Sequence, residues 1–413
     1  FKGVDPIGKV LMFKVNDYLE IKDLHVPTAY LDEFCQAFEI LLDNHAAQLV
    51  DVAVLSNFNS EPITALDETT RSALESIGFK ATGERMIRGA IVDPQPREIA
   101  ERALFHKHHL HQATRHENEI QALKKVTEIR DDFALRGRCE LYRVNLKSMA
   151  SAHRLHQGIN LRGHQVWASY EHFQDILAIR NEPADDELWD IVEFFSTNSD
   201  PNLFKERHAL SQAEFRKLVQ PLIRSGHIVQ DFRGGFRTVQ LRPNVDRVEL
   251  RREHIRKLVE QYPVITLRQL TQLAGTSFKP EELKAVLNVF EEDETLIKGF
   301  LVEDFHQVCW GRKELLEEAR SIPSIRDFVL PPSDPIAPYF ADIMKERFGF
   351  GSAYLVFRNA EPVAAFKANT RNKIIDVKDY EGSEKAWRIV KEFAWEHQMP
   401  LQTDLRIGGK KLQ

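Results

Sequence analysis

The chain has 413 residues, of which 43% are hydrophobic and 29% are charged, and its formal net charge is −6. This composition is typical of a soluble globular protein, and no apolar run approaches the roughly 20 residues of a membrane-spanning helix, so we expect no membrane insertion. The length predicts two to four domains. The net negative charge excludes a protein whose whole surface is basic and binds nucleic acid.

The three cysteines, Cys35, Cys139 and Cys309, are far apart and show no CxxC spacing. This excludes a zinc ribbon or a disulfide scaffold and is typical of a reducing compartment, so we expect a cytoplasmic protein. The first residue is Phe1 and no signal-peptide pattern follows it, so we expect a fragment of a longer chain.

The first part of the chain predicts a small αβ module over residues 1–95. Residues 10–24 alternate as a hairpin does, with Asn16-Asp17 at the turn. Apolar residues at intervals of three and four predict a helix over residues 30–45. A strand over residues 49–55, a polar turn and a short helix complete the module.

Residues 96–140 predict a helical spacer. The run 98–132 contains no proline or glycine and carries an apolar stripe, which indicates one long helix or two helices with a short break. Its histidines could bind a metal, or they could form a helix face that is solvated or lies between domains. Without an HExxH pattern or a suitably spaced cysteine or carboxylate, we favour the helix face and expect no metal site. These histidines are His106, His108, His109, His111 and His116.

Two blocks with the parts of a winged helix follow, over residues 141–247 and 248–326. The first block contains a helix over residues 186–196, a polar loop, a helix over residues 211–224 and a hairpin over residues 227–241.

The hairpin of the first block has Arg233-Gly234-Gly235 at its turn, where glycine supplies the positive φ of a tight turn. In a winged helix, Arg233 and Arg237 would contact phosphates. The alternative is a solvated hairpin in which arginine protects a sheet edge.

The helix before the hairpin supports binding of nucleic acid. Its apolar side holds Phe215, Leu218, Leu222 and Ile223, and we expect it to bend near Pro221. Basic residues outnumber acidic ones by about two to one over residues 205–257. The opposite side of the helix carries side chains that can contact phosphates and base edges: Gln212, Arg216, Lys217, Gln220 and Arg224.

The second block repeats the pattern with helices over residues 250–262, 266–275 and 280–293 and a strand pair over residues 295–311. The third helix carries five carboxylates that a phosphate backbone would repel, so we expect it to pack against protein. They are Glu281, Glu282, Glu291, Glu292 and Asp293.

The end of the chain predicts a second β-rich αβ module over residues 327–413. Residues 327–338 are rich in proline and indicate a boundary or a structured loop. A hairpin over residues 363–380, a helix and a strand then repeat the plan of residues 1–95, which indicates a possible duplication.

Absent motifs limit the chemistry of the chain. The sequence lacks GxxxxGK[ST], GxSxG, GxGxxG and EF-hand spacings, so it has no ATPase motif, and we expect no cofactor. An ATP-driven motor would lie in another region or a partner chain.

Several short motifs resemble known DNA-processing proteins. The run ILAIRNEPADDELWDIVEFF, residues 176–195, resembles the region after the motor in Lhr-type large helicases. Residues 328–360 resemble the closing segment of those proteins and of winged-helix DNA glycosylases that unhook interstrand crosslinks. NFNSEPI, residues 57–63, with ALESIGF, residues 73–79, is similar to the last turn and helix of the same module. The motifs span residues 140–413 and most of the first ninety.

The resemblance implies tandem winged helices beside a small β-rich domain that grip DNA. With the elements predicted above, this indicates an α+β protein with tandem winged-helix domains, a long helical spacer and small αβ modules at both ends, acting as the DNA-gripping part of an Lhr-like repair or processing protein. One alternative is a DNA glycosylase, although Arg180-Asn181-Glu182 replaces the glutamine-containing catalytic triplet of that family. The other alternative is a scaffold for protein contacts. The sequence predicts DNA as the partner and leaves enzymatic activity open.

Overall fold

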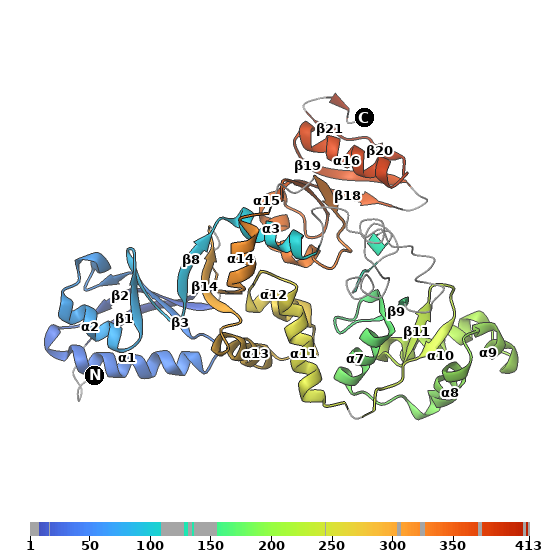
Figure 1. The fold of residues 1–413 in the computed structure, drawn as a ribbon, viewed down its shortest axis with the longest axis horizontal. Helices are drawn as coiled ribbons and strands as arrows, with labels where there is room; N and C mark the ends of the chain where they lie inside the picture. The colour runs from blue at the N-terminus through green and yellow to red at the C-terminus, as the bar shows by residue number, and fades with distance from the viewer. Residues whose placement is uncertain are drawn as a thin grey trace. The chain divides into compact units, whose positions relative to one another are not determined.

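The computed structural model of the protein describes residues 8–15, 17–108, 128–130, 134–135, 155–243, 245–303, 307–322, 327–370, 374–407 and 410–411. Its helices and mainly antiparallel sheets confirm the predicted α+β fold class (Figure 1). None of the described helices combines the length and apolar character needed to cross a membrane.

The chain groups into two compact units. The first contains Phe1–Ala100, Tyr262–Leu270 and Lys279–Arg320, and the second contains Glu101–Gln261, Thr271–Phe278 and Ser321–Gln413. This grouping does not test the five ranges predicted from the sequence, which remain predictions.

A mixed sheet with the order β5-β4-β2-β3-β7-β6 forms the start of the first unit, and β1 pairs with β2 as the predicted hairpin (Figure 1). The helices α1 and α2 bury apolar side chains such as Phe38 and Leu74 against one face of this sheet. The elements are β1 (Lys9–Val15), β2 (Tyr18–His25), α1 (Leu31–Ala46), β3 (Val52–Leu55), β4 (Asn57–Phe58), β5 (Glu61–Pro62), α2 (Glu68–Ser76), β6 (Phe79–Thr82) and β7 (Arg85–Arg88).

The other face of this sheet packs on the second block. Tyr18 contacts Phe300 edge-on, with ring centroids 5.5 Å apart. The predicted strand pair forms as β14 (Ile297–Val302) and β15 (Cys309–Gly311), and β14 also pairs in parallel with β8 (Ile91–Gln95). The remaining elements of this block within the first unit are β13 (Val264–Ile265), α13 (Pro280–Glu292) and α14 (Lys313–Ala319).

The second unit holds the first block, built on the sheet β10-β9-β11-β12. Its aromatic core contains Phe195, Phe204 and Phe215. The elements are β9 (Leu155–Ile159), β10 (Gln165–Ser169), α7 (Tyr170–Arg180), α8 (Trp189–Thr197), α9 (Pro201–Arg207), α10 (Gln212–Ser225), β11 (Ile228–Asp231) and β12 (Phe236–Thr238). Next comes α11 (Arg247–Glu260), and α12 (Leu267–Ala274) crosses the boundary between the units.

The predicted polar loop of the first block is wrong, because α9 lies within it. Asp200 caps this helix by accepting from the backbone N–H of Asn202 at 2.8 Å, and Pro201 occupies the first turn. Phe204 then enters the aromatic core, which gives this otherwise polar segment a reason to fold as a helix.

The predicted helix over residues 98–132 forms as α3 (Arg97–Lys107) but does not include residues 128–130. There Glu128 has a positive φ of 57°, and Ile129 forms a β-bridge with Trp167. The backbone groups of Ile129 are thus satisfied by β-pairing rather than by a helix. Residues 109–127 lie outside the described part of the chain, and with them His109, His111 and His116.

The C-terminal module in the second unit has a sheet with the order β16-β17-β18-β19-β20. Its hairpin, helix and parallel strand follow the order of β1, β2, α1 and β3, and both parallel pairs join the second hairpin strand to the strand after the helix. A duplication remains a prediction. The elements are β16 (Phe328–Leu330), α15 (Ala341–Phe348), β17 (Tyr354–Arg358), β18 (Glu361–Asn369), β19 (Ile375–Gly382), α16 (Glu384–Glu396) and β20 (Leu401–Thr403).

Candidate nucleic-acid interface

The helix α10 has a capping box at its start. The Ser211 backbone N–H donates to the Glu214 carboxylate at 2.9 Å, and the Glu214 backbone N–H donates to the Ser211 hydroxyl at 3.3 Å. These bonds satisfy backbone groups that the first turn would otherwise leave unpaired. These bonds stabilise the first turn of a helix of 14 residues, which is about 21 Å long at a rise of 1.5 Å per residue.

The buried side of α10 is close to the one that the sequence predicts. Phe215 and Leu222 are buried, and Leu218 and Ile223 are partly buried. The prediction omitted Val219, which is buried as well and lies one turn after Phe215. This anchoring leaves the polar side of α10 exposed.

The hairpin β11–β12 is fixed at its tip by Asp231. Its carboxylate accepts from the backbone N–H groups of Arg233 and Gly235, each at 2.8 Å. Gly234 has a positive φ of 87°, as the sequence predicts, whereas Gly235 does not. A Cβ atom at Gly235 would lie 3.0 Å from the carbonyl oxygen of Ser199, so this glycine permits a close backbone approach.

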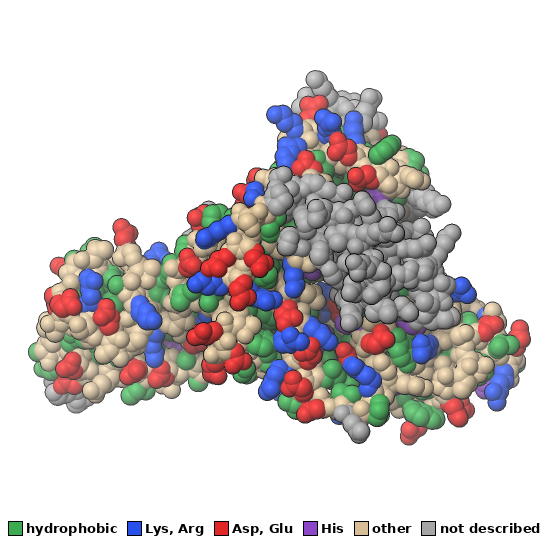
Figure 2. Space-filling model, viewed as in Figure 1, with side chains coloured by type: hydrophobic (Ala, Val, Ile, Leu, Met, Phe, Trp, Pro, Cys, Tyr) green, Lys and Arg blue, Asp and Glu red, His purple; other side chains and the backbone are tan. Residues whose placement is uncertain are grey.

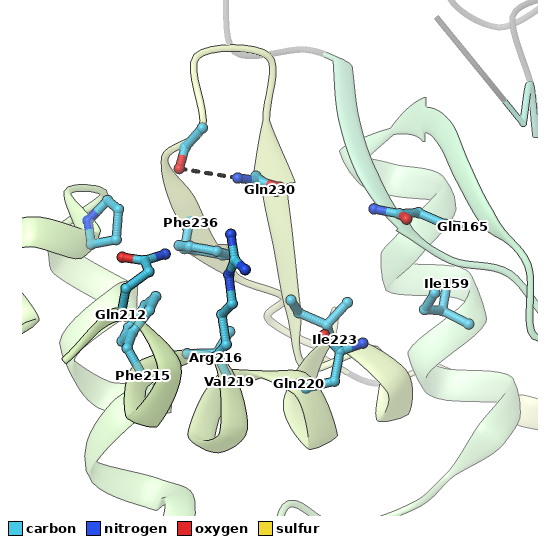
Figure 3. Close-up of a pocket in the computed structure, with 12 residues that line it drawn as sticks. Ile159, Gln165, Gln212, Phe215, Arg216, Val219, Gln220, Ile223, Gln230 and Phe236 are labelled. Carbon is cyan, nitrogen blue, oxygen red and sulfur yellow. Dashed lines mark hydrogen bonds between the residues drawn. The ribbon is translucent and has the colours of Figure 1, made fainter. Parts of the chain in front are cut away.

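A groove of about 330 Å³ lies between α10, the hairpin and strands β9 and β10 (Figure 3). We call it the α10–hairpin groove. Its apolar surface includes Phe215, Val219 and Phe236, and polar groups come from α10, β10 and β11. Figure 3 shows side chains of α10 rising toward the hairpin, with Gln165 and Ile159 on the other side.

The predicted contact residues are all exposed, but only some of them line the groove. The seven are Gln212, Arg216, Lys217, Gln220, Arg224, Arg233 and Arg237. Gln212, Arg216 and Gln220 line the groove at intervals of four residues. Lys217 and Arg224 do not line it, and they lie nearly two turns apart on the adjoining outer side of α10.

Arg237 lies on the opposite face of the hairpin from the groove. Its neighbour Phe236 lines the groove, and successive side chains in a strand point to opposite faces. The Arg237 guanidinium lies over the Tyr170 ring, 4.0 Å from its centroid. The Tyr170 hydroxyl of α7 donates to the Thr238 carbonyl of β12 at 2.9 Å, so a hydrogen bond connects this helix to this strand.

The cations of α10 and the hairpin differ from those of α11 in their pairing. On α11, Arg256 contacts Glu253 at 2.7 Å and Glu260 at 2.5 Å. Figure 2 accordingly shows Lys and Arg mixed with Asp and Glu over α11. Within the described residues, no ion pair involves the following cations: Arg216, Lys217, Arg224, Arg233 and Arg237. Unpaired cations remain available to an external anion.

Sequence reasoning missed the groove residues that come from the sheet. Ile159, Gln165 and Gln230 lie on β9, β10 and β11, and Gln230 pairs with Gln157 across β11 and β9. Alternation of polar and apolar residues in these strands is the local signal. Their approach to α10 depends on strand pairing between distant segments.

A partly buried carboxylate, that of Glu128, connects several segments of the second unit. Glu128 accepts from Asn160 at 2.9 Å and from Arg162 at 2.8 Å, and it contacts His172 Nε2 at 3.2 Å. Burial favours the neutral acid, but His172 and Arg162 outweigh this effect and hold the pKa of Glu128 well below its ordinary value. The cluster therefore acts as a structural anchor for residues 128–130.

The segment Arg180-Asn181-Glu182 also contributes to the fold. The Arg180 guanidinium donates to the backbone carbonyls of Asn160 and Arg224, and Asn181 ends α7 in a left-handed conformation. Glu182 is the one carboxylate among these three residues, and its side chain is exposed. Among the described residues, no three His, Cys, Asp or Glu side chains are placed to hold a metal ion.

Neither a family model nor a curated protein matches the sequence. Among solved structures, the fold is similar to that of the DNA glycosylase AlkZ from Streptomyces sahachiroi, with a TM-score of 0.51 and 11% sequence identity. The similarity covers 75% of this chain and 100% of that chain. At this identity the likeness concerns the fold alone, so the chain shares its α+β fold with a DNA glycosylase.

Proposed function

We propose that α8, α9 and α10 with the β11–β12 hairpin form a winged helix that binds DNA. The contact surface, which we call the α10–hairpin surface, consists of Gln212, Arg216, Lys217, Gln220, Arg224 and Arg233. The observation that carries the proposal is a set of exposed cations, without ionic partners among the described residues, on a helix and an adjacent hairpin tip in a protein of net charge −6.

This surface has the chemistry that duplex DNA requires. Arginine and lysine side chains neutralise phosphates and release counterions, while glutamine amides can contact base edges. A helix about 21 Å long can lie in the major groove while a hairpin reaches the neighbouring backbone. Arg237 lies on the other hairpin face, so we assign it a smaller role than Arg233.

The variant R216E/R233E tests the proposal. Because both contacts become repulsive, we expect duplex affinity at low salt to fall about tenfold or more, and the slope of log affinity against log salt to decrease by about 2. Fluorescence anisotropy with a labelled duplex at several salt concentrations measures both effects.

The control R388E/K391E makes the same change of charge on α16. Both residues are exposed, and Figure 2 shows Lys and Arg gathered over the C-terminal module. Its affinity should stay within about twofold of the unmodified protein, because screening limits distant charges. Unchanged affinity of R216E/R233E at low salt would refute the proposed surface. Absent duplex binding by the unmodified protein would favour the protein scaffold.

A second candidate function is removal of a damaged base, favoured by the likeness to a DNA glycosylase over that protein's whole length. A carboxylate would activate water or stabilise the sugar of a flipped nucleotide. Incubation with uracil-containing or alkylated oligonucleotides, followed by alkali, tests this candidate. Strand cleavage by the protein that E182Q lacks would assign Glu182 a role, whereas equal cleavage by E182Q would exclude it.

The relation to Lhr-type helicases remains a hypothesis based on the short sequence motifs. It proposes a helicase motor in the same or a partner chain. The complete reading frame tests this hypothesis, because a phosphate-binding loop encoded beside this region would support a helicase.

A further inference from the structure

The α10–hairpin groove has a lining unlike that of a simple phosphate site. In the part of the chain that the structure describes, its only charged lining residue is Arg216, and it has no carboxylate. Four glutamines contribute amides: Gln165, Gln212, Gln220 and Gln230. Phosphate recognition normally uses several cations, whereas this groove combines apolar surface with neutral donors and acceptors.

Two of these amides are oriented by bonds to other side chains. The carbonyl oxygen of Gln212 accepts from the Lys205 ammonium group at 2.7 Å, so its NH₂ group remains as a donor. The NH₂ group of Gln165 donates to Gln157 at 2.8 Å, so its carbonyl oxygen remains as an acceptor. The groove thus has a donor on the α10 side and an acceptor on the sheet side.

A third amide is oriented by the hairpin itself. The NH₂ group of Gln230 donates to the Gly234 carbonyl at 3.2 Å, which the dashed line in Figure 3 marks. Its own carbonyl oxygen therefore supplies a second acceptor. Because these bonds restrict the amides before a ligand arrives, little side-chain entropy is lost on binding.

We infer that the α10–hairpin groove binds one unstacked nucleobase of the DNA held by the α10–hairpin surface. A nucleobase has flat apolar faces, which match the partly exposed side chains of Ile159 and Ile223, and a polar edge that matches fixed amides. The volume of about 330 Å³ is at the small end of ligand pockets and suits one planar group. This inference rests on the proposed function, because Arg216 joins the groove to the phosphate-binding surface.

The test compares a matched duplex with the same duplex carrying one unpaired 2-aminopurine. We expect the unmodified protein to bind the second duplex about tenfold more tightly, the scale of one well-made base contact, and to change the emission of 2-aminopurine. Anisotropy measures the two affinities, and emission reports the surroundings of the base.

The variant Q165W fills the groove from its exposed rim without changing the α10–hairpin surface. It should lose the preference and the emission change, while affinity for the matched duplex stays within about twofold. Q165A keeps the space but removes the acceptor, so the preference should fall about threefold. Q272W, at an exposed glutamine of α12 outside the groove lining, is the matched control and should behave as the unmodified protein.

The outcomes separate this inference from the function on which it rests. Binding of both duplexes with equal affinity, or a preference that survives in Q165W, overturns the nucleobase site and leaves DNA binding intact. Equal weakening of both duplexes by Q165W shows that the groove holds DNA backbone and also overturns the site. Absent binding of either duplex at low salt overturns both proposals.

Discussion

The helices α10 and α13 stand before strand pairs in two successive blocks, yet they use charge in opposite ways. On α10, Arg216 and Lys217 face solvent without an ionic partner among the described residues. On α13, the exposed positions include Glu281 and Glu292, and the one lysine, Lys284, is only 5% exposed. A repeated pattern of elements therefore does not predict a repeated surface charge, because the charge depends on which side chains occupy the exposed face of each helix.

The buried lysine of α13 belongs to a compact ionic cluster. Lys284 lies 3.0 Å from Asp51 and also donates to the Leu49 carbonyl at 2.9 Å, and Lys298 lies 2.8 Å from the same carboxylate. Burial opposes ionisation of Asp51, but two ammonium groups outweigh it and lower its pKa. Burial also lowers the pKa of Lys284, since one carboxylate shared by two lysines compensates only in part.

The largest expected effect is that of D51A. Removing this carboxylate leaves two ammonium groups buried without their partner, so we expect a loss of about 3–5 kcal/mol in stability. Hydrogen exchange of the amides in β2 and β14 measures the loss within the first unit. DNA affinity should not change, since the α10–hairpin surface is intact.

D43A is the matched control, because Asp43 pairs with Arg88 at 2.8 Å while its side chain is 62% exposed. An exposed ion pair contributes little, so its removal should cost less than about 1 kcal/mol. Equal effects of D51A and D43A would show that the cluster around Asp51 does not stabilise the fold.

The second largest effect concerns His254, which α11 buries at the start of the second block. Its ring stacks on Phe278 with centroids 5.6 Å apart. Burial first, and then the nearby charge of His172, lower its pKa from 6.5 to about 4, and Glu128 opposes this shift. The unfolded chain therefore binds a proton at a higher pH than the folded chain.

As pH falls from 6.5 to about 4, stability should decrease by about 3 kcal/mol, and the contribution should be constant above that window. Glu128 adds a further loss as pH falls below its unfolded pKa, near 4.5. Urea unfolding at intervals of pH measures this dependence. H254F should flatten the curve between pH 6.5 and 5, and an unaltered slope in this variant would assign the dependence to other groups.

Much of the two blocks could be predicted from the sequence because the signals are local. The apolar spacing of Phe215 and Leu222 predicted α10 within one residue at each end, and the same pattern predicted α13. The start of α9 also had a signal, Asp200 followed by Pro201, but the polar composition of the segment concealed it.

The groove could not be predicted because distant strands form its walls. Gln165 reaches it from β10 only through the pairing of β9 with β10 and β11. The orientation of Arg237 follows from strand alternation, once the burial of Phe236 fixes which face is inward. Sequence composition identified the cations correctly as exposed, but it did not separate the two faces of the hairpin.

A smaller effect should follow from S211A at the start of α10. Loss of the hydroxyl leaves the Glu214 backbone N–H without its capping acceptor, which should cost about 1 kcal/mol. The comparison with α13 supplies the control, since Lys279 precedes that helix without a capping bond from its side chain. K279A should therefore change unfolding by less than S211A in urea titrations, and the reverse order would show that the capping box contributes little.

The smallest effect should be that of E292K/D293K on DNA binding. Both residues are exposed at the end of α13, where lysine also suits the negative pole of the helix, so the fold should persist. At 0.15 M salt the screening length is about 8 Å, so added cations outside the contact surface should change duplex affinity by less than about twofold. K217E/R224E, an exchange of the same size and opposite sign on α10, should lower it about tenfold. A comparable gain from E292K/D293K would place α13 beside the DNA and remove the contrast between the two helices.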